Sequence, residues 1–483
     1  MYLEKIRDSI LTRKEIYSQM AAQIWDYAEL AFHEYRSSEL LCATLEKEGF
    51  TVQRGIAGLS TAFVGRWGAG SPMIGLLGEF DALSGLNQMS GSAERQPTTP
   101  EQKGGNGHGC GHNCLGVGSL AAAVAIKEYL DSCKLPGTIL YFGCPAEEGG
   151  SGKTFMARAG AFSQLDAALT WHPYDVNRVF TTSTLANCQA LFHFKGVSAH
   201  AGMAPHLGRS ALDALELMNT GVQYLREHII DSSRIHYAVL NTGGSSPNVV
   251  QANASALYLI RAPKIQEVQD IYRRVNLVAQ GAAMMTETSV DVTFIKACSD
   301  LLPNKVLESQ IFQNMTAYPL PEYTQEEYTF AQKIAASYTM PHTALDDILE
   351  EYPEEYHEEI QSLFQHRGRI NNFVLPIYHS PQITPGSTDV GDVSHNCPTA
   401  QFYAAALPDG CLNHSWQEVA STKTTIAFKG MLYAGMVLAG TAVDLFTQPD
   451  LLKLAQKEFQ KRTSNQTYCC PIPESVLPPS NSF

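Results

Sequence analysis

Apolar residues recur at helical spacing along the first fifty residues of the chain, as at Leu40, Leu41 and Leu45. The pattern ends at Gly49, and a glycine just after the last apolar position is a common helix end. Residues 2–50 therefore predict two helices.

After residue 49 the pattern changes to short runs rich in β-branched and aromatic residues, separated by glycines. The runs with strand character cover residues 50–52, 61–64, 73–77, 138–142 and 167–170. An alanine-rich stretch with helical character, residues 115–130, lies between the third and fourth runs. Strands that alternate with helices indicate an α/β fold, in which a mixed sheet is flanked by helices.

The pattern changes again near Asn187, where the expected elements follow in the order β-α-β-β-α-β. The strands are expected at residues 190–194, 235–240, 254–260 and 289–294, and the helices at 211–227 and 265–283. This order is that of a ferredoxin-like unit. We expect residues 188–298 to form a second domain, inserted into a discontinuous first domain of residues 1–187 and 299–483.

Three other stretches add to this organisation. Residues 301–385 are acidic, and the six glutamates between Glu350 and Glu359 predict a solvent-exposed helical face. The longest apolar stretch, Gly430 to Val443, is shorter than the roughly 20 residues that cross a bilayer, so it predicts a buried helix. Met1 to Arg13 lacks the continuous apolar core of a signal peptide, so we expect neither export nor a membrane partner.

Composition and charge narrow the class of protein. The chain of 483 residues is 44% hydrophobic and 17% charged, which is typical of a globular protein. Its 34 basic against 48 acidic residues give a net charge of −14, which argues against nucleic acid as a partner. Eleven scattered cysteines do not form the dense framework of a small secreted domain, so we expect a cytoplasmic protein.

The most informative motif is His108-Gly109-Cys110-Gly111-His112-Asn113. A thiolate at Cys110 and an imidazole at His112, one residue apart, can reach the same cation, and the glycines let the backbone pass close to it. From this motif alone, Cys110 could also be a reactive thiol or an inert buried cysteine.

Two further motifs follow predicted strands. Glu147 and Glu148 come just after one strand, and His172 comes just after the next. Strand carboxyl ends are where open α/β sheets place ligand sites, and neighbouring side chains on an extended backbone point in opposite directions. One glutamate can therefore bind a metal while the other faces the substrate, although an adjacent pair of glutamates is also common on solvated surfaces.

Two competing kinds of site are not supported. A phosphate loop ending in Gly152-Lys153-Thr154 would require a glycine at position 147, where a glutamate would repel phosphate. A serine hydrolase would require a G-x-S-x-G elbow, which the sequence lacks.

Taken together, the motifs resemble those of peptidase family M20, the dinuclear metallopeptidases of the aminoacylase and carboxypeptidase type. The resemblance covers nearly the whole chain and is greatest to the amidohydrolase branch, which carries an H-x-C-G-H-[DN] motif. The matching stretches are Glu29 and Glu34 in the early helices, Gly78–Leu83, His108–Asn113, Glu147–Glu148, Trp171–Pro173, Gly196–Gly202, Gly386–Asp389 and Asn413–Trp416.

The resemblance implies a set of metal ligands and a general base. The ligands carried over are Cys110, His112, Glu148, His172 and His414, with Cys110 bridging two divalent ions, manganese or zinc. Glu147 then becomes the general base. The chemistry agrees, because two cations can lower the pKa of a shared water and a nearby carboxylate can take its proton.

Further residues match family positions around the substrate. His200 matches a histidine that reaches across a dimer to stabilise the oxyanion, so residues 188–298 are expected to act as a lid and dimerisation domain. Asn248 and Arg261 match positions that bind the substrate carbonyl and carboxylate, although Arg261 could instead form a surface salt bridge. Asp81 matches a carboxylate that orients a ligand, although it could be a plain turn residue.

Some details depart from the family pattern. Asn113 replaces the aspartate usual in the amidohydrolase branch, Trp171-His172-Pro173 differs from the common G-L-H, and residues 386–390 lack the usual E-D-F. These changes weaken inference about the substrate pocket more than inference about the ligands. An insertion at residues 85–107, rich in Gly, Ser, Gln and Thr, is expected near the pocket mouth.

The leading hypothesis is a metal-dependent amidohydrolase that releases an amino acid, glutamate, from an N-acyl compound such as p-aminobenzoyl-glutamate. One alternative is a dipeptidase or aminoacylase that acts on another N-acyl amino acid. The other alternative is a non-catalytic member of a heteromeric hydrolase. We expect a homodimer or a heteromer with a related hydrolase chain.

Overall fold

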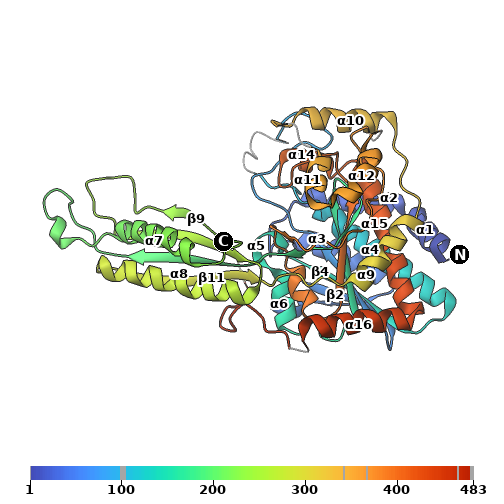
Figure 1. The fold of residues 1–483 in the computed structure, drawn as a ribbon, viewed down its shortest axis with the longest axis horizontal. Helices are drawn as coiled ribbons and strands as arrows, with labels where there is room; N and C mark the ends of the chain where they lie inside the picture. The colour runs from blue at the N-terminus through green and yellow to red at the C-terminus, as the bar shows by residue number, and fades with distance from the viewer. Residues whose placement is uncertain (1, 98–104, 341–342, 366–367, 465–466, 479–483) are drawn as a thin grey trace.

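The structure is a computed structural model that describes residues 2–97, 105–340, 343–365, 368–464 and 467–478. A broad body of helices around a sheet carries a narrower extension of strands and two helices on one side (Figure 1). The broad body is built from chain on both sides of the extension in sequence, so the extension is an insertion.

A seven-stranded mixed sheet forms the centre of the broad body. In spatial order its strands are β1 (Thr51–Arg54), β2 (Phe63–Ala69), β4 (Gly137–Cys144), β3 (Met73–Glu79), β5 (Ala167–Tyr174), β13 (Thr399–Ala405) and β6 (Arg178–Phe180). The four strands β4, β3, β5 and β13 are parallel, so their carboxyl ends meet at one edge. Every residue of β4 is buried, as expected for a strand covered on both faces.

Helices cover the sheet, and two of them pack together as the core. These two are α4 (His112–Cys133) and α15 (Thr425–Thr447), and both are buried along most of their length. Among the described residues, α15 is the one helix long and apolar enough to cross a membrane, and 89% of its most apolar window is buried. The prediction of a buried helix at residues 430–443 is therefore confirmed.

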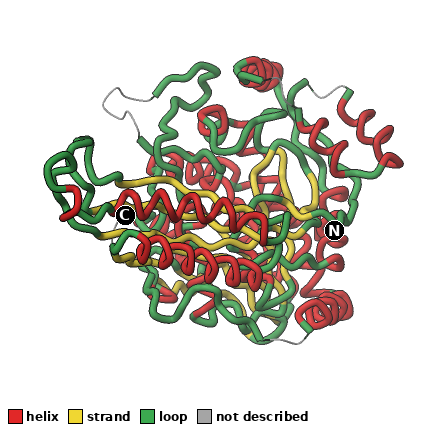
Figure 2. The backbone as a smooth tube through the Cα atoms, turned by 60° about the vertical axis from the view of Figure 1, so that its left-hand side comes forward, coloured by secondary structure: helices red, strands yellow, loops and turns green. Residues whose placement is uncertain are grey.

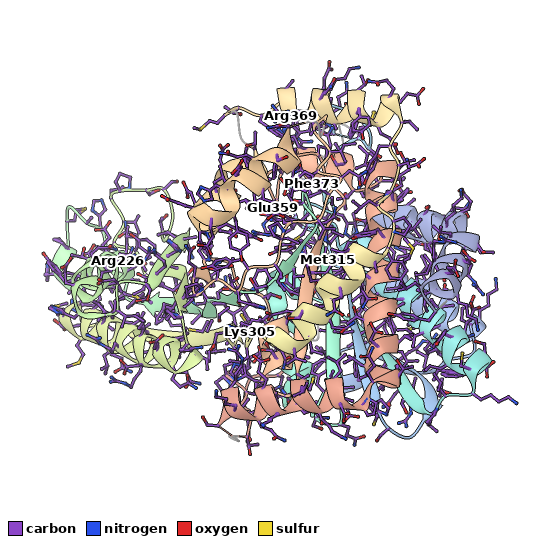
Figure 3. The ribbon with its side chains drawn as sticks, turned by 45° about the vertical axis from the view of Figure 1, so that its right-hand side comes forward. Arg226, Lys305, Met315, Glu359, Arg369 and Phe373 are labelled. Atoms are coloured by element: carbon purple, nitrogen blue, oxygen red, sulfur yellow. The ribbon has the colours of Figure 1, made fainter. Side chains whose placement is uncertain are left out.

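The other helices of the broad body surround this core. They are α1 (Tyr2–Thr12), α2 (Lys14–Tyr27), α3 (Tyr35–Lys47), α5 (Glu147–Gly150), α6 (Gly152–Arg158), α9 (Lys305–Ala317), α10 (Gln325–Ala336), α11 (Ala344–Glu351), α12 (His357–Phe364), α13 (Val390–Ser394), α14 (Trp416–Ser421) and α16 (Pro449–Thr463). Helix α9 begins at exposed Lys305 and carries buried Met315 near its end (Figure 3).

The first fifty residues form three helices, whereas the spacing predicts two. Arg13 leaves the helical conformation between α1 and α2, with φ −104° and ψ 12°, so the apolar stripe continues through a break that periodicity cannot detect. Helix α2 then ends at Ala28, which has a left-handed conformation with φ 42°.

The extension is a four-stranded antiparallel sheet with two helices on one face (Figure 2). Its elements are β8 (Ala186–Lys195), α7 (Ala211–Leu225), β9 (Arg234–Asn241), β10 (Asn253–Ala262), α8 (Ile265–Met285) and β11 (Ser289–Cys298). They follow the predicted β-α-β-β-α-β order, and we call this extension the lid domain. Helix α7 buries Leu215, Met218 and Val222 at helical spacing, and Ser210 caps its first turn.

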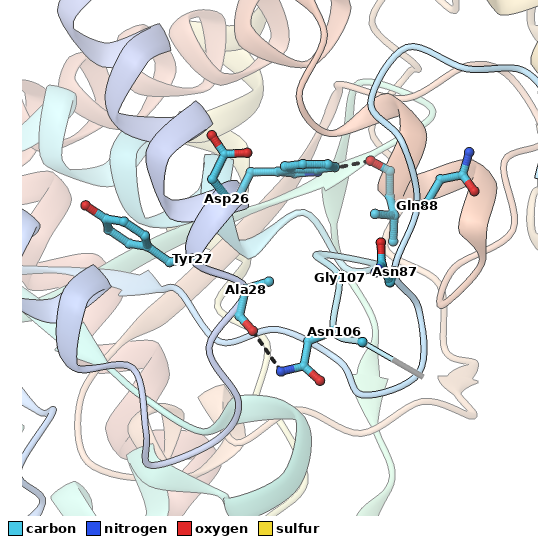
Figure 4. A pocket seen from close by; sticks show the side chains of 10 residues that line it. Asp26, Tyr27, Ala28, Asn87, Gln88, Asn106 and Gly107 are labelled. Carbon is cyan, nitrogen blue, oxygen red and sulfur yellow. Dashed lines mark hydrogen bonds between the residues drawn. The ribbon is translucent and has the colours of Figure 1, made fainter. Parts of the chain in front are cut away.

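The acidic segment and the insertion lie on the surface of the broad body. Glu350 and Glu359 are exposed, as the sequence predicts. The described part of the insertion helps to line a cavity of about 520 Å³ beside Trp25 and Val419, where Asn106 donates to the Ala28 carbonyl (Figure 4). Residues 98–104 of the insertion lie outside the described residues.

Candidate metal centre

The carboxyl edge of the parallel strands brings the chemistry-bearing motifs together. Strand β3 ends at Glu79, and Asp81 follows it. Strand β4 is followed by Glu147 and Glu148, and β5 carries His172. The cysteine motif lies directly before α4, so all of these groups meet at the same edge of the sheet.

The five predicted ligands converge in two groups that share one sulfur. Cys110, His112 and His172 form the first group, and Cys110, Glu148 and His414 form the second, with ligand atoms within 4.8 Å of one another in each. Cys110 Sγ lies 3.3 Å from His172 Nε2. His414 Nε2 lies 3.2 Å from Glu148 Oε1. One thiolate between two half-sites is the arrangement that a bridged pair of ions requires.

Asp81 holds two of these ligands in place. Its Oδ1 lies 2.9 Å from His112 Nδ1, and its Oδ2 accepts the backbone N–H of Glu148 at 2.9 Å. This leaves His112 Nε2, which is fully buried and makes no hydrogen bond to any described residue, pointing at the site. Thiolate, imidazole and carboxylate donors in this arrangement fit divalent cations.

The charges at the site favour ligand forms of the side chains. Burial raises the pKa of Glu148, but the hydrogen bond to His414 and the charge of His112 outweigh it and bring the pKa to about 2. Burial and the charge of His112 lower the pKa of His172 to about 4, so its ring is neutral near pH 7. Burial and nearby carboxylates raise the pKa of the Cys110 thiol well above its ordinary value. A cation is therefore needed to keep Cys110 as a thiolate.

Glu147 occupies a tight turn beside the ligands. Ala146, just before it, has φ 59°, and its N–H is bound by Glu34 Oε1 at 2.9 Å. Glu34 is buried, and its Oε2 accepts the Thr61 hydroxyl at 2.8 Å. Burial and the charges of Glu79 and Asp389 raise the pKa of Glu147 well above its ordinary value. A raised pKa makes the ionised carboxylate a stronger base.

A buried ion network lies beneath the site. The Lys153 ammonium is 2.6 Å from Glu79 Oε1 and 2.5 Å from Asp389 Oδ1, and all three side chains are almost fully buried. Burial would raise the pKa of Glu79, but the charges of Lys153, His112 and His172 hold it below its ordinary value. Sequence reasoning missed this network, because Lys153 stood out only as part of a failed phosphate-loop pattern.

The ligands line a cavity of about 340 Å³ between the two domains. Arg261 reaches it from β10 of the lid domain and donates to the Pro385 carbonyl at 3.2 Å. Its Nε is buried and has no hydrogen-bond partner among the described residues. The aromatic rings of Tyr174 and Tyr403 stack at 4.4 Å on another part of the wall.

His200 and Asn248 lie together in the lid domain, away from this cavity within one chain. The N–H of Ala201 donates to the Asn248 carbonyl at 2.9 Å, and both His200 and Asn248 are exposed to solvent. The described residues of the 85–107 insertion line a different cavity, so the expectation of a position at the pocket mouth is not met by that part.

Comparison with known proteins agrees with this geometry. The chain is 47% identical to one of the proteins that make up the p-aminobenzoyl-glutamate hydrolase of Escherichia coli (strain K12), over 98% of each chain. It is 27% identical to the "Xaa-Arg dipeptidase" of Mus musculus, over 91% of this chain and 88% of the relative.

The fold also matches a crystal structure from Bacillus subtilis, described as a dinuclear metal binding peptidase from the M20 family. The TM-score is 0.54 at 14% identity, over 90% of this chain and 99% of the other. The model of "Peptidase family M20/M25/M40" matches residues 75–411. The chain thus belongs to peptidase family M20/M25/M40 and is a hydrolase that acts on amide bonds.

Proposed function

We propose that the chain hydrolyses p-aminobenzoyl-glutamate to p-aminobenzoate and glutamate, with two divalent ions, manganese or zinc, as cofactors. The observation that carries the proposal is the pair of ligand groups that share Cys110 beside Glu147. The substrate is supported by the Escherichia coli relative, which is similar along nearly the whole chain. We also propose the cytoplasm as the compartment, on the cysteine pattern and charge of the sequence.

The proposed ligands are Cys110, His112 and His172 for one ion and Cys110, Glu148 and His414 for the other. When bound, the cations supply Lewis acidity, which polarises the amide carbonyl and makes water a nucleophile near neutral pH. Asp81 keeps the tautomer of His112 fixed, because a carboxylate can only accept the proton of Nδ1.

Glu147 is proposed to move the proton. Its carboxylate takes a proton from the attacking water and passes it to the amide nitrogen as the carbon–nitrogen bond breaks. The turn fixed by Glu34 keeps Glu147 from swinging away from the cavity, since it constrains the residue directly before it.

Arg261 is proposed to bind a carboxylate of the glutamate moiety. It comes from the lid domain, lines the metal-site cavity and keeps its buried Nε without a hydrogen bond to the described residues. An arginine fork matches a carboxylate with two parallel hydrogen bonds. The stacked rings of Tyr174 and Tyr403 offer an apolar surface to the aryl group.

His200 is proposed to stabilise the oxyanion from a second protomer, with Asn248 beside it at the substrate carbonyl. Their exposed position on the lid domain, away from the cavity of their own chain, supports a role in trans. The second protomer is another copy of this chain or a related hydrolase chain. The latter is supported by the Escherichia coli relative, whose name makes it one part of a larger enzyme.

The test is release of p-aminobenzoate by the purified chain with added manganese or zinc, alongside a chelator control and a Glu147→Gln variant. We expect chelator-sensitive release that the variant lacks. A chain that binds two ions, leaves this substrate intact and cleaves a dipeptide ending in arginine would show that the substrate assignment is wrong. Activity that appears only with an added related chain would establish the heteromer.

A further inference from the structure

The two carboxylate oxygens of Glu79 have different partners. Glu79 is the last residue of β3 and is 3% exposed. Oε1 lies 2.6 Å from the Lys153 ammonium, and Oε2 lies 3.2 Å from His112 Nε2. One oxygen is therefore neutralised by a buried lysine, while the other faces the ring nitrogen expected to bind a metal.

The protonation of His112 makes the second contact informative. Its Nδ1 lies 2.9 Å from Asp81 Oδ1, and because a carboxylate only accepts, the proton of the neutral ring sits on Nδ1. Nε2 then presents a lone pair to the Glu79 oxygen, and no hydrogen bond joins them in the described structure. A lone pair and a carboxylate oxygen repel each other at this distance unless a cation lies between them.

The separation fits a shared cation. Two ligand atoms at about 2.1 Å from one ion are about 3.0 to 3.4 Å apart at the angles of octahedral and tetrahedral sites. The observed distance between Glu79 Oε2 and His112 Nε2 is 3.2 Å. Glu79 and His112 also belong to one group of ligand atoms within 4.8 Å of one another, together with Glu147.

We infer that Glu79 is an additional metal ligand, which binds through Oε2 the same ion as Cys110, His112 and His172. The inference rests on the proposed metal centre. Lys153 is the positioning residue of this ligand, and Asp389 balances the charge of Lys153 through an ion pair of 2.5 Å, so Lys153 does not cancel the charge of Glu79 at the ion.

The inference makes the two ions unequal. The first ion then has four protein ligands, Cys110, His112, His172 and Glu79, whereas the second has three, Cys110, Glu148 and His414. Sites with four protein ligands hold zinc structurally, and sites with three leave a position open for water or substrate. The first ion is therefore retained tightly and the second exchanges more readily.

The test is equilibrium dialysis of the full chain against zinc, with bound metal measured directly. The variants are Glu79→Gln and, as a matched control, Asp389→Asn, which removes a carboxylate from the same lysine but not from the face of His112. We expect two ions of unequal affinity in the unmodified chain. Glu79→Gln should weaken the tight ion at least 10-fold, and Asp389→Asn should change it less than 3-fold. Unchanged affinity in folded Glu79→Gln would overturn the inference.

A crystal structure of the unmodified chain loaded with zinc tests the same inference without any variant. Glu79 Oε2 should lie about 2.0 to 2.2 Å from the ion at His112. An ion at His112 with Glu79 out of reach would remove this inference and leave the proposed function intact. A chain that binds no ion would refute both.

Discussion

The Nδ1 of His112 and the Oδ1 of Asp81 are joined by a buried contact of 2.9 Å, and the other oxygen of Asp81 accepts the N–H of Glu148 at 2.9 Å. One carboxylate thus sets the position of two candidate ligands that belong to different motifs and to different ion groups. A change at Asp81 should disturb both ion sites together.

We predict that Asp81→Ala lowers the affinity for metal by about 10- to 100-fold, because His112 loses its orienting partner. Metal titration with bound metal measured after dialysis checks this. Asp131→Ala, which removes an exposed aspartate of α4, is the matched control and should bind metal normally. Normal affinity in a folded Asp81→Ala protein would show that Asp81 is only a turn residue.

Glu147→Gln should separate metal binding from turnover. The variant keeps the ligand groups, so we expect both ions to be retained while the rate falls by at least about 100-fold through loss of the general base. His112→Ala, in contrast, should lose metal. The measurements are metal content and turnover of the same samples, and a Glu147→Gln rate near that of the unmodified chain would refute the base assignment.

Mixing two inactive proteins tests the role of His200 in trans. In a dimer formed from one His200→Ala chain and one Glu147→Ala chain, one site combines an intact Glu147 with an intact His200 from the partner. We expect partial recovery of activity after exchange of protomers, which is confirmed by mass analysis of differently sized chains. Exchange without recovery would place His200 in its own chain's site or outside catalysis.

Lys153→Met should destabilise the fold by about 3 to 5 kcal/mol, since it leaves the buried carboxylates of Glu79 and Asp389 without a cation. Thermal unfolding measures the loss. Lys453→Met is the matched control, because that lysine side chain is 72% exposed and forms only a surface pair. Equal midpoints for the two variants would contradict the account of the network.

Asp175 should make stability depend on pH. Burial raises its pKa to about 7, although the N–H of Gly410 acts in the opposite direction, and the charge of Asp409 adds to the rise. Between about pH 4 and pH 7 the folded chain binds more protons than the unfolded chain, so this group lowers stability as pH rises.

Asp175→Asn keeps an acceptor for Gly410 and removes the titration. The difference in unfolding temperature, variant minus unmodified chain, should therefore grow in favour of the variant from pH 4 to pH 7 and then level off. Groups common to both proteins cancel in this difference, and a difference that does not change with pH would show that Asp175 stays ionised.

Much of the site could be predicted because it follows a topological rule. Glu148 and His172 come after or within strands that are parallel neighbours of β3, so their meeting at one edge follows from the alternation of strands and helices. Cys110 and His112 precede the helix between these strands. His414 could be placed only through the family resemblance, because it lies in a loop far along the chain.

The remainder depends on tertiary contacts that leave no local pattern. Nothing in the periodicity around Lys153 distinguishes a buried ammonium from a surface one, and its partners Glu79 and Asp389 are distant in sequence. Glu34 likewise acts on the turn at Ala146 across the fold. A break such as Arg13 changes the helix count without changing the apolar spacing.

The insertion of the lid domain into the central sheet also sets an order of synthesis. Strand β13 at residues 399–405 pairs with β5 at residues 167–174, and α15 at residues 425–447 covers α4. The central sheet and its apolar core therefore stay incomplete on the ribosome until the last quarter of the chain emerges, whereas the lid strands are complete by residue 298. Nascent chains of this protein expose the apolar face of α4 for most of translation, which makes them natural clients of ribosome-associated chaperones.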